Sequence, residues 1–125
     1  MNTIHGDYSV TVSEKIITVI LKGAFNEIGF QSFILQVREA VEAFSGNPFY
    51  ILIDASELIG ATPDAFSELE SVNQWINTQN MQAKALVINS IVNSNTIQKS
   101  TPALKKQNLQ HFDTRESALQ WLKTI

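Results

Sequence analysis

The sequence contains no cysteine, which excludes disulfides, thiolate catalysis and cysteine-ligated metals together. It also lacks a membrane-length apolar run, because the longest, residues 16–21, is the size of a strand, whereas a membrane span needs about 20 residues. The opening MNTIHGDYS has neither the basic start nor the apolar stretch of a signal peptide. We therefore expect a cytoplasmic protein.

Basic charge is scarce, with 9 Lys and Arg against 12 Asp and Glu and a net charge of −3. A nucleic-acid-binding protein usually carries a clear basic excess, so no nucleic-acid partner is expected. The charge is uneven, because residues 83–125 hold 6 of the 9 basic side chains. This basic third indicates either contact with an anionic surface or a solvated helix face.

Cofactor and metal motifs are missing as well. The 5 glycines are isolated, so there is no glycine-rich nucleotide loop and no nucleophile elbow. His5 and His111 have no companion at metal-binding spacing, and we expect neither a metal nor a cofactor. Asp54 and Asp64 flank the turn expected after a buried strand, but turn hydrogen bonds and the helix dipole give both a structural role. The sequence therefore predicts no catalytic residues and no enzyme.

The apolar pattern begins with two strands. Residues 8–13 alternate apolar and polar side chains, which predicts a half-buried strand with Val12 facing inward. Residues 16–22 predict a second strand, ended by Gly23, and the short connection between the two indicates a hairpin.

The period then changes to that of a helix, with one apolar stripe over residues 29–44. Residues 49–53 are apolar on both faces, as is typical of a central strand covered on two sides. A second helix follows, for which Thr62 provides the cap, Pro63 the first position and Asp64 a charge that complements the helix dipole.

The last third predicts a further helix whose cap is Asp113 and whose inner face includes Ile125. Residues 90–107 are harder to assign, because Pro102 either breaks or begins a helix there. Two short strands are expected, at residues 85–88 and 109–112. The order β-β-α-β-α-β-α-β-α predicts an α/β fold with a mostly parallel mixed sheet of about five strands that opens with a hairpin.

This order and the closing motif F-D-T-x-E-x-A-x-x-W-L, residues 112–122, resemble the SpoIIAA-like family. That family shares the fold of STAS domains, the anti-sigma-factor antagonists. The resemblance spans nearly the whole chain and implies one domain over residues 1–125. It further implies a non-enzymatic regulatory or protein-interaction module with a protein partner.

Typical STAS domains carry an Asp-Ser-Ser-Gly stretch at the start of the helix after the central strand, where a partner kinase phosphorylates a serine. Alignment on Asp54 and Ser56 places Pro63 and Asp64 at the two serine positions. The resemblance therefore implies that no phosphorylation switch operates, with Ser56 or Thr62 as the substitutes to test. Asp54, Ser56, Thr62 and Asp64 become the candidates for ligand or partner binding.

The same broad fold group includes the CRAL-TRIO lipid-exchange proteins, which hold an apolar ligand beneath a mobile helix. By analogy, residues 90–107 are a candidate lid, and an ordinary covering helix is the other interpretation. An amphipathic segment can lie on an anionic membrane, so the alternative function is binding of a small apolar, lipid-like ligand with peripheral membrane association. The candidate lid residues are Ile97, Lys99, Leu104, Lys105 and Lys106. Edge strands also leave a homodimer open.

Overall fold

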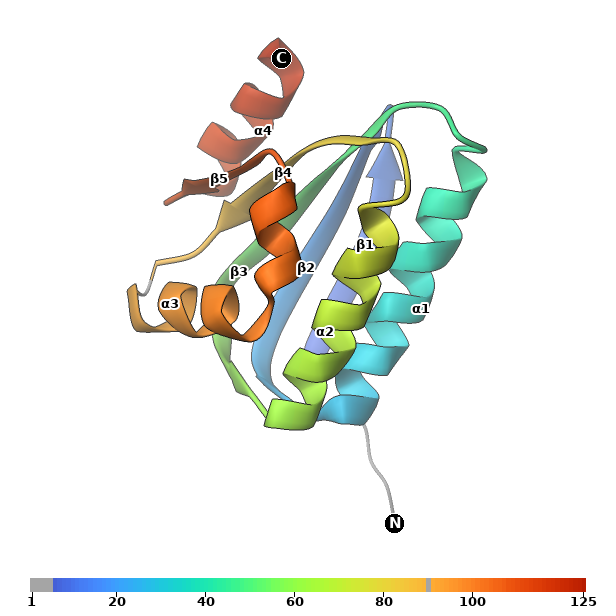
Figure 1. Ribbon diagram of the computed structural model, residues 1–125. Helices are drawn as coiled ribbons and strands as arrows, with labels where there is room; N and C mark the ends of the chain where they lie inside the picture. The colour runs from blue at the N-terminus through green and yellow to red at the C-terminus, as the bar shows by residue number, and fades with distance from the viewer. Residues whose placement is uncertain (1–5, 90) are drawn as a thin grey trace.

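The computed structural model describes residues 6–89 and 91–125, and it confirms the predicted order of elements (Figure 1). Residues 1–5, including His5, and residue 90 lie outside the described part. The strands are β1 (Asp7–Ser13), β2 (Ile16–Phe25), β3 (Phe49–Ala61), β4 (Met81–Val87) and β5 (Leu109–Phe112). The helices are α1 (Glu27–Ala43), α2 (Pro63–Ile76), α3 (Ile91–Ser100), the short 3-10 helix η1 (Pro102–Lys106) and α4 (Arg115–Thr124).

The strands form one sheet in the order β1-β2-β3-β4-β5. β1 is antiparallel to β2, and the pairs β2–β3, β3–β4 and β4–β5 are parallel. The opening hairpin and the mostly parallel mixed sheet are thus confirmed. Helices α1, α2 and α3 pack on one face of the sheet, and α4 packs on the other (Figure 1).

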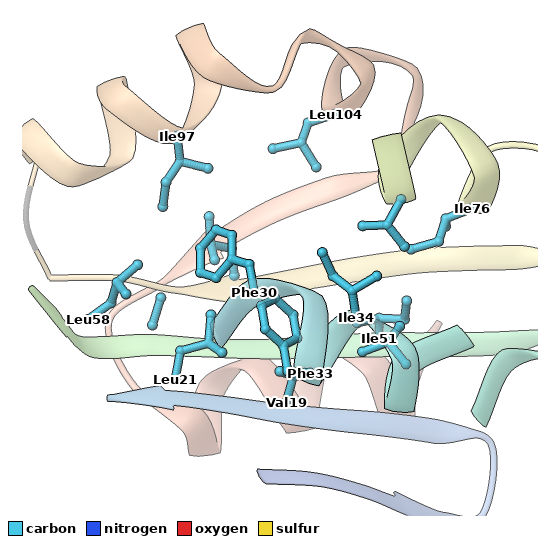
Figure 2. Packing of buried hydrophobic residues seen from close by; sticks show 14 of the residues in the cluster. Val19, Leu21, Phe30, Phe33, Ile34, Ile51, Leu58, Ile76, Ile97 and Leu104 are labelled. Atoms are coloured by element: carbon cyan, nitrogen blue, oxygen red, sulfur yellow. The ribbon is translucent and has the colours of Figure 1, made fainter. Parts of the chain in front are cut away.

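The main core lies between the sheet and the first three helices. The predicted stripe of α1 is buried there, with Phe30 and Phe33 in edge-on contact at 5.1 Å between ring centroids. Figure 2 shows both rings beneath Ile97 and Leu104. The second, smaller core lies under α4 and includes three alanines, which allow the helix to lie close to the sheet; its buried members are Ile16, Leu52, Ala83, Ala85, Val87, Ala118 and Leu122.

Strands β2 and β3 are both longer than the sequence predicted. Gly23 does not end β2: it adopts a positive φ of 85° between two register shifts, and the strand continues to Phe25. β3 continues alongside it to Ala61, and the amide of Thr62 donates to the Phe25 carbonyl over 3.1 Å. The sequence predicts a turn after residue 53, and in the structure residues 54–61 extend the strand.

Two helix starts also differ from the prediction. α1 begins two residues earlier than expected, because Asn26 caps it by accepting a hydrogen bond from the amide of Gly29 over 2.8 Å. The cap of α4 is Thr114 and not Asp113, since the Thr114 hydroxyl accepts from the amide of Ser117 over 3.2 Å. A hydroxyl and a carboxylate are both good caps, and the chain path selects between two adjacent candidates.

Predicted inward positions near the edges of the sheet are open to solvent. Val12 is 51% exposed near the end of β1, and Ile125 is 51% exposed at the end of the chain. β4 begins at Met81, four residues before the predicted start at residue 85. This earlier start places Lys84 inside the strand.

The segment after β4 forms two short helices. α3 is followed by Thr101, and Pro102 begins η1. Of the two roles expected for this proline, breaking a helix or beginning one, it begins a helical turn. Polar side chains of α2 hold η1: Glu70 accepts from the amide of Ala103 over 3.0 Å, and Asn77 donates to the Ala103 carbonyl over 3.0 Å. The segment is therefore attached to α2 mainly through η1.

Candidate functional site

Asp54 lies in the middle of β3, on the face that α4 covers, and its side chain is 6% exposed. Oδ2 accepts a hydrogen bond from Nε of Arg115 over 2.9 Å. Oδ1 accepts from both the amide and the hydroxyl of Ser56, over 3.0 and 2.6 Å. The carboxylate therefore joins the first turn of α4 to the central strand.

The surroundings of Asp54 keep it ionised. Burial alone raises the pKa of this carboxyl, but the two hydrogen bonds from Ser56 and the charged contact with Arg115 outweigh it, so the pKa lies below its usual value. A carboxylate with a lowered pKa is a poor proton donor at neutral pH. The geometry suits a structural ion pair.

The Ser56 hydroxyl is engaged in that arrangement. It donates to Asp54 from a half-buried position within β3. Phosphorylation of Ser56 would remove this hydrogen bond and place a dianion beside the Asp54 carboxylate. Ser56 is therefore the weaker of the two substitute phosphoacceptors.

Thr62, Pro63 and Asp64 lie at the far end of β3, where α2 starts. The Thr62 hydroxyl accepts from the amide of Ala65 over 3.2 Å, Pro63 occupies the first turn, and Asp64 is exposed there. This is the predicted cap. Seven residues of strand lie between Asp54 and Thr62, a span on the order of 25 Å. The four candidates consequently form two separate groups, one at the middle of β3 and one at the start of α2.

The lid candidates divide by side-chain type. Ile97 and Leu104 are buried in the main core, whereas Lys99, Lys105 and Lys106 are exposed (Figure 2). The apolar side chains thus point to the sheet, and the charged ones to solvent. In this arrangement α3 and η1 form a covering segment over the core. Its apolar side can meet a membrane only if the segment moves away from the sheet.

A small apolar cavity of about 50 Å³ lies beneath α3 and η1. Its walls come from the sheet, α1, α2 and the covering segment, and they are apolar except for two side chains, Asn73 of α2 and Lys84 of β4. Figure 2 shows Ile97 and Leu104 directed from above toward Phe30 and the strands. The apolar members of the wall are Leu21, Phe30, Phe33, Ile53, Ala55, Leu58, Phe66, Leu69, Leu86, Ile97, Leu104 and Leu109.

Lys84 is the residue that the sequence analysis missed. It is 4% exposed, and Nζ donates to Oδ1 of Asn73 over 2.6 Å. Burial lowers the pKa of this ammonium to about 7. The relevant feature of the sequence is a lysine within the apolar run MQAKALVI. The predicted strand begins after this lysine, so its burial was not predicted.

The described residues contain no group of three His, Asp or Glu side chains that could hold a metal ion. Within the same part of the chain, no helix has the length and apolar character to cross a membrane.

Comparison with known sequences places this fold in a family. Residues 16–123 match the SpoIIAA-like family, which is most of the chain. The chain belongs to the SpoIIAA-like family. Comparison with curated proteins gives no significant match for this SpoIIAA-like sequence.

Solved structures with the SpoIIAA-like fold superimpose on nearly the whole chain. A protein from Shewanella loihica PV-4, described as uncharacterized with a SpoIIAA-like fold, has a TM-score of 0.70 and 15% identity, covering 98% of this chain and 97% of its own. The anti-sigma factor antagonist SpoIIAA in its unphosphorylated form has a TM-score of 0.69 and 11% identity, covering 95% and 100%. An anti-sigma factor antagonist from Mycobacterium paratuberculosis has a TM-score of 0.67 and 13% identity, covering 95% of each chain.

At these identities the comparisons establish the SpoIIAA-like fold, and function needs arguments from the residues. The family match includes both groups of β3 candidates, the covering segment and Lys84, since all of them lie between residues 16 and 123. Arg115, the partner of Asp54, also lies within it, and its pairing with a residue 61 positions away was not evident from the closing motif.

Proposed function

We propose that this SpoIIAA-like protein is a non-enzymatic regulatory module that binds a protein partner through the start of α2. The fold is that of solved anti-sigma factor antagonists, two of which are named so. The observation that carries the proposal is the exposed Asp64 beside the completed Thr62 cap. This surface presents a fixed charge for recognition, and its local hydrogen bonds are already made.

The same surface supports the absence of a phosphorylation switch. Pro63 has no hydroxyl, and Asp64 places a permanent negative charge where STAS domains carry a phosphorylatable serine. The charge of Asp64 is present without phosphorylation, so binding through this surface does not depend on a kinase. Thr62 is the remaining exposed hydroxyl of the stretch, and its oxygen already accepts from Ala65.

Partner capture with matched charge reversals tests the proposal. The tagged protein, Asp64→Lys and Glu42→Lys are used to capture proteins from the source cell; Glu42 is exposed on α1 and serves as the control. We expect one reproducible partner with the wild type and the control, and its loss with Asp64→Lys. Equal capture by all three proteins, or no partner at all, would rule out the start of α2 as the binding surface.

A second candidate function is binding of a small apolar ligand, because the covering segment closes over an apolar cavity. The cavity of about 50 Å³ is a third of the ~150 Å³ that accepts benzene in a known case, so a ligand requires the segment to move outward. Native mass spectrometry of the protein purified from cells tests this function. Extra mass that leaves on denaturation supports it, and a bare chain mass contradicts it. The same spectrum tests whether the protein forms the homodimer that the edge strands leave open.

Peripheral membrane contact would accompany that function through the exposed Lys99, Lys105 and Lys106. Electrostatic contact with an anionic bilayer weakens as salt screens it. We expect co-sedimentation with vesicles that contain phosphatidylserine, reduced by salt and by replacement of the three lysines with glutamine. Indifference to the vesicles at low salt would remove the membrane part.

A further inference from the structure

Among the described residues, no acidic side chain forms an ion pair with the buried ammonium of Lys84. One of its three N–H groups donates to Asn73, and within the described part of the chain the other two have no protein acceptor. The strands on either side place Ile51 and Leu109 opposite Lys84. On α2, the carboxylate of Glu70 accepts from the amide of Ala103.

Burial of a charge without a counter-ion is strongly unfavourable. Fold stability therefore gives no reason for a lysine at this position, where an apolar side chain of similar length would fill the same space. Asn73 cannot be its full partner, because its Oδ1 is shared with Nε2 of Gln107 at 3.2 Å. Lys84 itself is one of the side chains that line the apolar cavity.

The composition of that wall defines what it can bind. Among the described residues that line it, Lys84 is the one ionisable group, and the remainder is apolar apart from Asn73. A single ammonium with two unused donors matches a compact head with one negative charge. A phosphate dianion would leave a second charge uncompensated among apolar side chains.

We propose that the cavity beneath α3 and η1 binds a small amphiphilic monocarboxylic acid, whose carboxylate pairs with Lys84 while its apolar body displaces the α3–η1 segment outward. The inference rests on the apolar-ligand candidate above and adds the head group. The carboxylate accepts the two unused N–H groups, so the ligand completes the hydrogen bonding of Lys84. The apolar body then contacts Phe30, Phe66 and Leu86.

Titration calorimetry with octanoate and octan-1-ol tests the pairing, because the two probes share a chain and differ in charge. The wild type is compared with Lys84→Met, and with Lys123→Met as a control that removes an exposed charge from α4, on the other face of the sheet. At about pH 6, where Lys84 is largely charged, we expect octanoate to bind the wild type and Lys123→Met at least about tenfold more tightly than octanol. This preference is lost in Lys84→Met.

A second measurement on the wild type keeps the test independent of the variant's folding. Octanoate stays ionised from about pH 6 to about pH 9, whereas Lys84 loses its proton, so the preference for octanoate falls over this range. Equal affinity for both probes at each pH, or a preference retained in Lys84→Met, overturns the pairing and leaves the apolar-ligand function in place. If neither octanoate nor octan-1-ol binds, both the pairing with Lys84 and the apolar-ligand function are overturned.

Discussion

Arg115, in the first turn of α4, donates from Nε to Oδ2 of Asp54 over 2.9 Å and so connects the last helix to the middle of the central strand. The carboxylate end of this pair is buried and the guanidinium end is half exposed. The pair lies beside the small alanine-rich core that α4 shares with the sheet. It therefore adds a polar attachment to the apolar packing between α4 and the sheet.

Arg115→Gln removes the charge that faces Asp54. We expect it to lower the free energy of unfolding by roughly 1–2 kcal/mol near neutral pH, a value kept small because the arginine is half exposed and Ser56 still bonds the carboxylate. Urea denaturation measures the change. Lys123→Gln, at an exposed site of the same helix, is the control and is expected to change little.

The difference between Arg115→Gln and the wild type has a defined pH dependence. The folded-state pKa of Asp54 is lowered, so its contribution is present above the unfolded-state value of about 3.9 and is lost as pH falls through the folded value. Denaturation curves from about pH 7 to about pH 3 follow it. A difference that grows toward acid would show that the pair does not set this pKa.

Lys84→Met is expected to stabilise the protein, because it removes a buried charge that has no counter-ion. The gain is roughly 1–4 kcal/mol at pH 6. The folded pKa of about 7 lies below the unfolded value of about 10.4, so the wild-type penalty is full below pH 7 and is relieved as pH rises between the two values. Thermal denaturation at several pH values should show the two proteins converging toward alkaline pH, and a constant difference would argue against a buried ammonium.

The sites around Asp54 and Lys84 show which features the sequence patterns did not predict. The apolar stripe of α1 and the Thr62 cap depend on neighbours within four residues or on burial of a whole face, and both were predicted. The sequence predicts Asp54 at the end of a strand, because the apolar run stops at residue 53. Its burial depends on Arg115, 61 positions away, and one sequence does not reveal which distant residue will be its partner.

The burial of Lys84 was not predicted for the same kind of reason. A lysine next to an apolar run suggests a strand end. Here the strand already begins at Met81, so that Lys84 lies inside it. Its burial depends on Asn73 and on a covering segment whose helices were not assigned from the sequence. The order of elements was predictable because it follows from period, while the pairing of polar groups inside the fold follows from tertiary contacts.

Thr62→Ala tests the cap at the start of α2. Loss of the hydroxyl leaves the Ala65 amide without its acceptor, and we expect a cost of about 1 kcal/mol. Ser67→Ala, one turn later on the exposed face, is the control and should stay within about 0.5 kcal/mol of the wild type. Equal effects of the two changes in urea denaturation would mean that the Thr62 hydroxyl has no capping role.

Ile97→Ala tests how the covering segment is held. Among the side chains of α3 that the structure describes, Ile97 is the buried one, so its truncation removes the main apolar contact of that helix. We expect faster amide hydrogen exchange confined to residues 95–100, while η1 keeps its protection through Glu70 and Asn77. Uniformly faster exchange across the sheet would indicate that α3 unfolds only with the whole protein.

The central claim is that the start of α2 contacts a protein partner, and site-specific photo-crosslinking in cells tests it most directly. A photoreactive side chain is placed at Ser67, exposed on the first turns of α2, and in parallel at Gln120, exposed on α4. The account predicts one discrete crosslinked protein from position 67, lost when Asp64→Lys is added, and none from position 120. Crosslinks from position 120 alone, or from neither position, would contradict it.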